Sequence, residues 1–194
     1  VPAFSPVDAD EEVGSALLPY IIFSGSARPV HEASRKDINE TLLEIIAKEG
    51  PVLGNWAYSS YVKASGGKRV GSAIYDKLNH ELILLTRRGE VIADDPLNRR
   101  SGGLRTYWLP GQQCHVIRKR GPRHLEDIPP LELAALLRYA ARSEGWDDAP
   151  LYREALKLLS LKRLTEQVWK TFSEVVPLAR KFEEAESETI DESF

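Results

Sequence analysis

Residues 66–89 read GGKRVGSAIYDKLNHELILLTRRG, and this stretch decides the fold. The paired glycines predict a turn. The apolar side chains after it recur at helical spacing on one face, at Val70, Ile74, Leu78, Leu82 and Leu85. Two arginines and a glycine close the stretch, which is typical of the end of a helix. We therefore expect a tight turn followed by an amphipathic helix from about residue 69 to residue 88.

The segments on either side of this helix predict a winged helix. Upstream, one amphipathic helix begins after the N-cap Ser34 and ends at Gly50, and a shorter helix covers residues 56–64. Between them, residues 51–53 are expected to form a short extended link. Downstream, residues 90–93 and 104–109 are expected to be strands on either side of a polar loop. Three helices followed by a two-stranded hairpin is the element order of a winged helix.

The second half of the chain repeats the helical part of the first half. Helices are expected at residues 128–145, 151–159 and 164–181. An offset of 94 residues places the sequence Lys-Arg-Val at 68–70 on Lys-Arg-Leu at 162–164, and it also matches the apolar face of the following helix. The sequence therefore predicts a mainly α fold with a small β-hairpin (α+β), built from tandem winged-helix or helix–turn–helix units.

The composition divides the chain into four segments. Residues 1–33 are expected to be an extended leader or linker, whose apolar stretch 17–23 docks as a strand or on a neighbouring domain. Residues 34–124 are expected to form the winged-helix domain, and residues 125–182 a second helix–turn–helix unit of three helices. Residues 183–194 contain six acidic side chains and predict a disordered tail.

Charge is distributed unevenly along the chain. The 194 residues include 26 Lys and Arg and 29 Asp and Glu, a net charge of −3. Residues 61–124 carry 13 basic and 5 acidic side chains, a net charge of +8, whereas residues 1–60 and 125–194 carry −5 and −6. A basic block of this kind indicates a polyanion-binding surface, and a solvated basic face without a ligand is the alternative.

Duplex or branched DNA is the polyanion that these residues suit best. The candidate groove contacts lie on the helix opposite its apolar face: Arg69, Ser72, Tyr75 and Asn79. The candidate phosphate contacts are Lys68, Arg99, Arg100, Arg105, Arg118, Lys119 and Arg120. The paired Gly102 and Gly103 would let the loop backbone approach a groove closely. The alternative is a protein–protein docking module of the same fold, because winged helices also bind proteins.

The second unit is less basic at the corresponding positions. Its basic side chains stand against Glu154, Glu166 and Glu174 at helical spacing, so we expect a solvated and self-paired surface. These basic residues are Arg153, Lys157, Lys162, Arg163 and Lys170. We expect this unit to pack on the first unit or to dock a partner.

The sequence argues against an enzyme. The neighbours Cys114 and His115 would point to opposite faces of a strand, the four histidines lack metal-ligand spacing, and no phosphate-binding loop is present. We therefore expect no catalytic residue, metal, cofactor or small-molecule substrate. No apolar run is long enough to cross a membrane, and a single cysteine suits a reducing compartment, so we expect a cytoplasmic protein. Because the chain begins at Val1 and contains no methionine, we expect a processed protein or a piece of a longer one.

Two short motifs, and a repeat of part of the second, resemble those of a known family. They are Glu-Gly-Pro-Val at 49–52 and Gly-Lys-Arg-Val-Gly at 67–71, with Lys-Arg-Leu at 162–164. Over roughly residues 37–180 the chain resembles the small C-terminal domain of unknown function of large bacterial superfamily 1 helicase-related proteins. Those proteins often carry a restriction-endonuclease-like domain just upstream. The resemblance implies a helicase or nuclease parent protein and a role in DNA repair or defence, and it carries over no catalytic residue.

Overall fold

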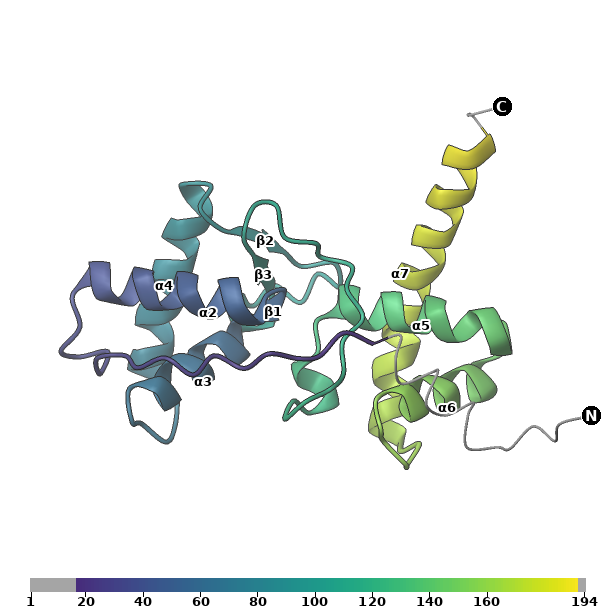
Figure 1. The fold of residues 1–194 in the computed structure, drawn as a ribbon, viewed down its shortest axis with the longest axis horizontal. Coiled ribbons are helices and arrows are strands. Elements are labelled where there is room, and N and C mark those ends of the chain that lie inside the picture. Colours follow the sequence, from purple (N-terminus) through teal and green to yellow (C-terminus); the bar gives the residue numbers. More distant parts are fainter. Residues whose placement is uncertain (1–16, 192–194) are drawn as a thin grey trace, which may run out of the picture. The chain divides into compact units, whose positions relative to one another are not determined.

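The computed structural model describes residues 17–191, with side chains described up to residue 181. These residues form six α-helices and one small antiparallel sheet, which confirms a mainly helical α+β fold (Figure 1). They separate into two compact units. The first unit is Ile21–Cys114 with Glu126–Pro130, and the second comprises the described residues up to Tyr20, His115–Leu125 and the chain from Leu131 onward. Residues 1–16 of the expected leader (1–33) and residues 192–194 of the expected tail (183–194) lie outside the described residues.

The first unit contains three helices and all three strands. Its elements are α2 (Arg35–Glu49), β1 (Val52–Leu53), α3 (Gly54–Ala64), α4 (Ser72–Arg87), β2 (Ile92–Asp94) and β3 (Thr106–Trp108). Ser34 begins α2 with a capping box, because its hydroxyl accepts from the Asp37 amide and the Asp37 carboxylate accepts from the Ser34 amide. Helix α2 packs against both α3 and α4 (Figure 1).

The sheet of the first unit has one strand more than expected. Its order is β1-β3-β2, with Val52 opposite Tyr107 and Ile92 opposite Trp108. The segment expected to be a simple link therefore supplies an edge strand. The physical reason is that Val52 and Leu53 are both buried, so their backbone groups need partners, and β3 provides them.

The core of the first unit confirms most of the predicted helical faces. Ile38, Leu42 and Leu78 are fully buried, whereas Ile74 is only partly buried against the same core. Residues 23–33 also belong to this core and are not a separate leader: Val30 is buried, and the carbonyl of Arg28 accepts a hydrogen bond from Tyr61.

The second unit contains the remaining helices, α5 (Pro130–Glu144), α6 (Asp148–Leu158) and α7 (Glu166–Asp191). Helix α7 continues to Asp191, although the acidic composition from residue 183 predicts disorder. Glu and Ala are good helix formers, which is why the backbone of this acidic segment prolongs the helix.

The leader contributes one short strand-like contact to the second unit. Leu18 forms an isolated parallel bridge with Arg118, through bonds of 3.1 Å from the Leu18 amide to the Ile117 carbonyl and 2.8 Å from the Lys119 amide to the Leu18 carbonyl. Docking as a strand was one of the two arrangements expected for this apolar stretch. Residues 115–124, which the sequence places in the winged-helix domain, lie in the second unit as well.

Candidate nucleic-acid interface

A tight turn joins α3 to α4 and exposes two cations. The amide of Gly66 donates to the Lys63 carbonyl at 3.0 Å, and the amide of Gly67 donates to the Val62 carbonyl at 2.8 Å. Gly66 has a left-handed φ of +77°, which glycine adopts without steric penalty. Beyond this turn Lys68 and Arg69 are exposed just before α4 begins.

These cations surround a small hollow, which we call the α3–α4 hollow. Its lining includes Lys63, Lys68, Arg69, Trp56 and Asp127. The ammonium of Lys63 lies 5.2 Å from the centre of the Trp56 ring, a cation–π contact that positions it. Three cations and one carboxylate give the hollow a net positive charge, so its chemistry suits an anion such as a phosphate.

Two of the four candidate groove contacts are already engaged within the first unit. The Tyr75 hydroxyl accepts from the Gly103 amide at 3.0 Å, and Asn79 Oδ1 accepts from the Tyr58 hydroxyl at 3.0 Å. The Tyr58 and Tyr75 rings meet edge to face with centres 5.2 Å apart. Burial raises the pKa of Tyr58 strongly, so its hydroxyl remains a donor. Tyr75 and Asn79 therefore brace α4, whereas Arg69 and Ser72 remain exposed.

The loop between β2 and β3 has a defined conformation. The Asp95 carboxylate accepts from the amides of Arg99 at 2.9 Å and Arg100 at 2.7 Å. This holds the loop so that Arg100 is exposed and Arg99 is half-buried, and Arg105 is exposed beyond it. A Cβ on Gly102 would lie 1.9 Å from Asn79 Oδ1. The absence of a side chain at Gly102 thus serves packing against α4, which the sequence did not indicate.

The contacts around the α3–α4 turn recur in the second unit at an offset of 94 residues. The Tyr152 ring meets the Trp169 ring edge to face with centres 5.0 Å apart, which corresponds to the contact between Tyr58 and Tyr75. The Tyr152 hydroxyl lies 3.2 Å from the Ser173 hydroxyl, which corresponds to the hydrogen bond from Tyr58 to Asn79. The amide of Ser160 donates to the Lys157 carbonyl at 2.9 Å, as Gly66 does to Lys63. The sequence match thus extends to the geometry of the turn.

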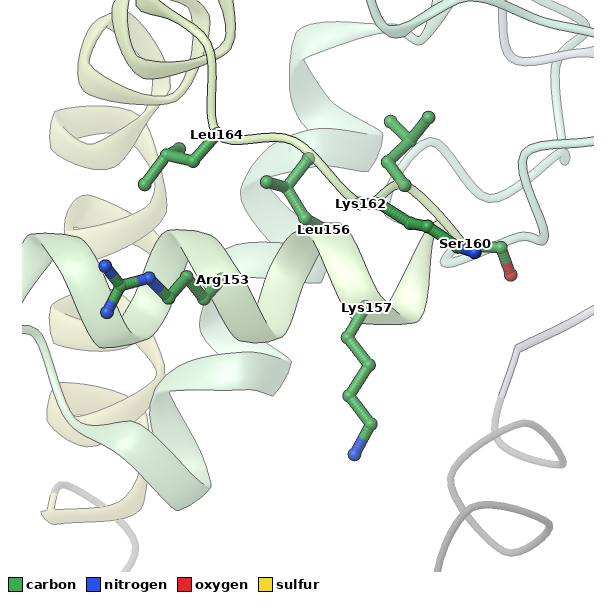
Figure 2. Close-up of a pocket in the computed structure, with 7 residues that line it drawn as sticks. Arg153, Leu156, Lys157, Ser160, Lys162 and Leu164 are labelled. Carbon is green, nitrogen blue, oxygen red and sulfur yellow. The ribbon is translucent and has the colours of Figure 1, made fainter.

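A second hollow lies at the turn between α6 and α7, and we call it the α6–α7 hollow. Figure 2 shows Arg153 and Lys157 on α6, with Ser160 and Lys162 in the segment that follows. Leu156, Leu161 and Leu164 complete the lining. The sequence predicts a self-paired surface for these basic residues and does not predict a shared hollow. The match of Lys63 with Lys157 and of Lys68 with Lys162 at the same offset was the signal that could have found it.

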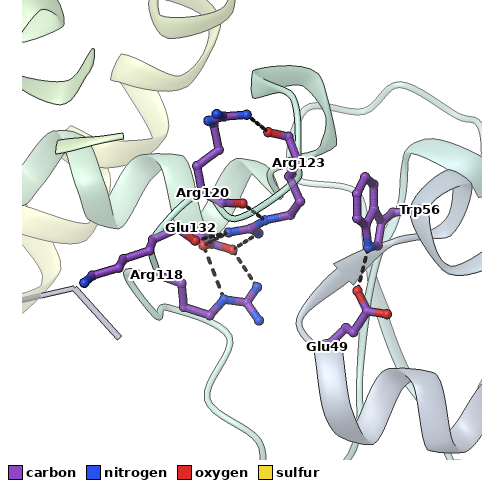
Figure 3. A network of polar contacts seen from close by, with 7 residues as sticks. Glu49, Trp56, Arg118, Arg120, Arg123 and Glu132 are labelled. Carbon is purple, nitrogen blue, oxygen red and sulfur yellow. Dashed lines mark hydrogen bonds and ion pairs between the residues drawn. The ribbon is translucent and has the colours of Figure 1, made fainter. Parts of the chain in front are cut away.

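The structure corrects the role expected for Arg118. Its guanidinium is buried and pairs with Glu132 of α5, with Nη2 2.6 Å from Oε2 (Figure 3). A side chain with 8% exposure and a carboxylate partner does not suit a phosphate contact. Of its two neighbours, Lys119 is exposed, whereas Arg120 donates to the carbonyl of Arg123 at 2.6 Å.

Arg123 is the residue of this cluster that the sequence analysis missed. Its side chain is 1% exposed and donates to both oxygens of Glu132, each at 2.9 Å. Its guanidinium carbon lies 3.9 Å from the centre of the Tyr20 ring. The signal for this cluster is an acidic residue, Glu132, between the buried leucines Leu131 and Leu133. An isolated carboxylate on an apolar face requires a buried cation.

The described residues contain no group of three or more His, Cys, Asp or Glu that could hold a metal ion. In the same part of the chain, no helix combines the length and the apolar character needed to cross a membrane.

Comparisons of the chain with protein-family models, with curated proteins and with solved structures give no match. The resemblance to the helicase-associated domain therefore stays a prediction.

Proposed function

We propose that this chain is a DNA-binding module of tandem winged-helix and helix–turn–helix units, accessory to a larger helicase or nuclease protein of repair or defence. The element order of the first unit supports the first part of this proposal. Its elements follow in the order α2, β1, α3, α4, β2 and β3, so that three helices are followed by the hairpin of β2 and β3, and β1 pairs with the other side of β3. The same turn hydrogen bonds recur between α6 and α7, and this recurrence supports a second helix–turn–helix unit.

The observation that carries the proposal is the α3–α4 hollow. Lys63 of α3 lines it together with Lys68 and Arg69, which precede the first residue of α4, Ser72, by four and three residues. Phosphates bind well at such a place, because the free amides at the start of a helix add to the charge of the side chains. A phosphate there would bring the exposed side chains of Arg69 and Ser72 to a groove. Arg100 and Arg105 would add contacts from the β2–β3 loop.

The test is the salt dependence of binding to a labelled mixed-sequence duplex of about 20 base pairs, measured by fluorescence anisotropy between about 50 and 200 mM salt. We expect affinity to fall steeply with salt. The variant K68Q/R69Q should lower the slope of log affinity against log salt by about 2, since each neutralised phosphate contributes about 0.9.

The matched control is K48Q/R87Q, which removes two exposed charges at the far ends of α2 and α4. It should change the affinity by less than about twofold. Absence of binding at the lowest salt would refute the proposal and favour the docking module that binds a helicase or nuclease subunit without DNA. Equal effects of the two variants would refute the α3–α4 hollow as the contact.

A further inference from the structure

We infer that the α6–α7 hollow is a second phosphate-binding site for the same duplex DNA. This inference rests on the proposed function. Three cationic side chains line the hollow, Arg153, Lys157 and Lys162, together with the exposed hydroxyl-bearing residue Ser160. Guanidinium, ammonium and hydroxyl groups are the side-chain donors that commonly bind phosphate oxygens.

The position of this hollow matches that of the first one. Lys157 and Lys162 correspond to Lys63 and Lys68 at the offset of 94 residues, and each pair lines its own hollow. The same two turn hydrogen bonds fix the backbone in both places, where Ser160 adopts the left-handed conformation (φ 55°) that Gly66 adopts in the first turn. Both turns therefore share a backbone conformation, and each has one lysine just before it and another just after it.

The side chains that line the α6–α7 hollow carry a larger net positive charge than those that line the α3–α4 hollow. Asp127 lines the α3–α4 hollow, whereas the lining of the α6–α7 hollow includes no acidic residue. Within residues 17–181 no ion pair involves Arg153 or Lys162, so the self-pairing expected from the sequence is not found for these two side chains. A phosphate would not have to displace a carboxylate from either of them.

The part of the second unit that contains the α6–α7 hollow is basic, and most of the acidic residues of the unit lie towards the two ends of the chain. Residues 17–20, 115–125 and 131–181 carry 13 basic and 7 acidic side chains, a net charge of +6, whereas the whole unit with residues 1–16 and 182–194 carries 13 basic and 17 acidic side chains, a net charge of −4. The first unit carries 13 basic and 12 acidic side chains, a net charge of +1. The acidic residues from 183 onward begin about 25 Å along α7 from its first turn, which is more than two Debye lengths at physiological salt.

The experiment uses the full chain and the same labelled duplex. The variant R153Q/K162Q removes two exposed charges from the α6–α7 hollow. We expect the salt slope to fall by about 2 and the affinity near 100 mM salt to fall roughly tenfold. The conservative variant R153K/K162R should keep the wild-type slope, because the number of cations is unchanged.

The matched control is R142Q/K181Q, which removes two exposed cations of the second unit that do not line the hollow. It should bind within about twofold of wild type. If R153Q/K162Q keeps the wild-type affinity and slope while K68Q/R69Q loses both, the second site is refuted and the proposed function stands. If the wild-type chain does not bind the duplex at low salt, the proposed function itself fails. If R153Q/K162Q and R142Q/K181Q weaken binding equally, the hollow is refuted as a specific site.

Discussion

Replacing Glu132 by glutamine would leave two buried guanidinium groups facing a neutral amide. In the native chain this carboxylate accepts four hydrogen bonds, two from Arg118 and two from Arg123, at 2.6 to 3.3 Å. The exposed fractions of the three side chains are 8%, 1% and 3% for Arg118, Arg123 and Glu132. Solvent is therefore poorly placed to compensate for the missing negative charge.

The expected loss of stability is large. Removing one partner of a buried ion pair typically costs about 3 to 5 kcal/mol, because the remaining charge stays buried. Two guanidinium groups share this carboxylate, so we expect the upper part of that range. At about 1.4 kcal/mol per factor of ten, a loss of about 4 to 5 kcal/mol should raise the unfolded or open population of the second unit by roughly 700-fold to 4,000-fold.

Native-state hydrogen exchange followed by mass spectrometry measures this effect locally. Peptides from α5 and α6 should exchange faster by the factor given above, up to the limit set by global unfolding. Glu144→Gln is the matched control, since it makes the same chemical change at an exposed position of the same helix. Its effect should stay within about 0.5 kcal/mol.

A double-mutant cycle separates the ion pair from other effects of the substitution. Arg123→Met alone should also destabilise the second unit. The double variant R123M/E132Q should lose less than the sum of the two single variants, by about 1 to 3 kcal/mol. An E132Q variant that loses less than about 1 kcal/mol, or a cycle without coupling, would show that the cluster is not a unit.

Three further predictions concern the first unit and the two turns. Burial raises the pKa of Tyr107 from 10.0 to about 12. The free energy of unfolding that this shift contributes is therefore fully present below pH 10 and is lost as pH rises towards 12. In urea unfolding measured at a series of pH values, Y107F should show a smaller fall in the free energy of unfolding between pH 10 and pH 12 than the native chain. Gly54→Ala should destabilise the first unit by about 1 to 3 kcal/mol in urea unfolding, because a Cβ there would lie 2.4 Å from the Gly102 carbonyl oxygen, and a cost near zero would contradict this close approach. Ser160→Gly should raise stability by up to about 1 kcal/mol, since it relieves a left-handed φ of 55°, and a lower melting temperature would count against that conformation.

The helices were predictable from the sequence because their determinants are local. Apolar side chains at helical spacing, such as Leu78 and Leu82 on α4, give both the element and its buried face. Glycines and N-caps mark the ends, as Ser34 does for α2. The edge strand β1 was missed because two residues carry no periodicity, and only the pairing with β3 makes them a strand.

The individual site residues were harder to predict, because a side chain's role depends on partners far away in the sequence. Arg118 and Lys119 are neighbours in one basic run, yet one is buried against Glu132 and the other is exposed. Tyr75 and Asn79 are expected on the face of α4 opposite its apolar side chains, but both are half-buried and Tyr75 packs against the core. The Gly103 amide and the Tyr58 hydroxyl also engage their polar atoms, and neither contact could be inferred from helical spacing.

The internal repeat resolves part of this difficulty, because it links each local feature to a second copy. The charge block at residues 61–124 suggested that only the first unit was basic. That block is divided in the fold, since residues 115–125 belong to the second unit and bring four cations with them. Net charge along the sequence therefore assigned four of the block's 13 cations to the wrong unit, whereas the offset of 94 residues pairs two turns that share their backbone hydrogen bonds. The proposed phosphate contacts therefore follow from the recurring turn and not from the charge block.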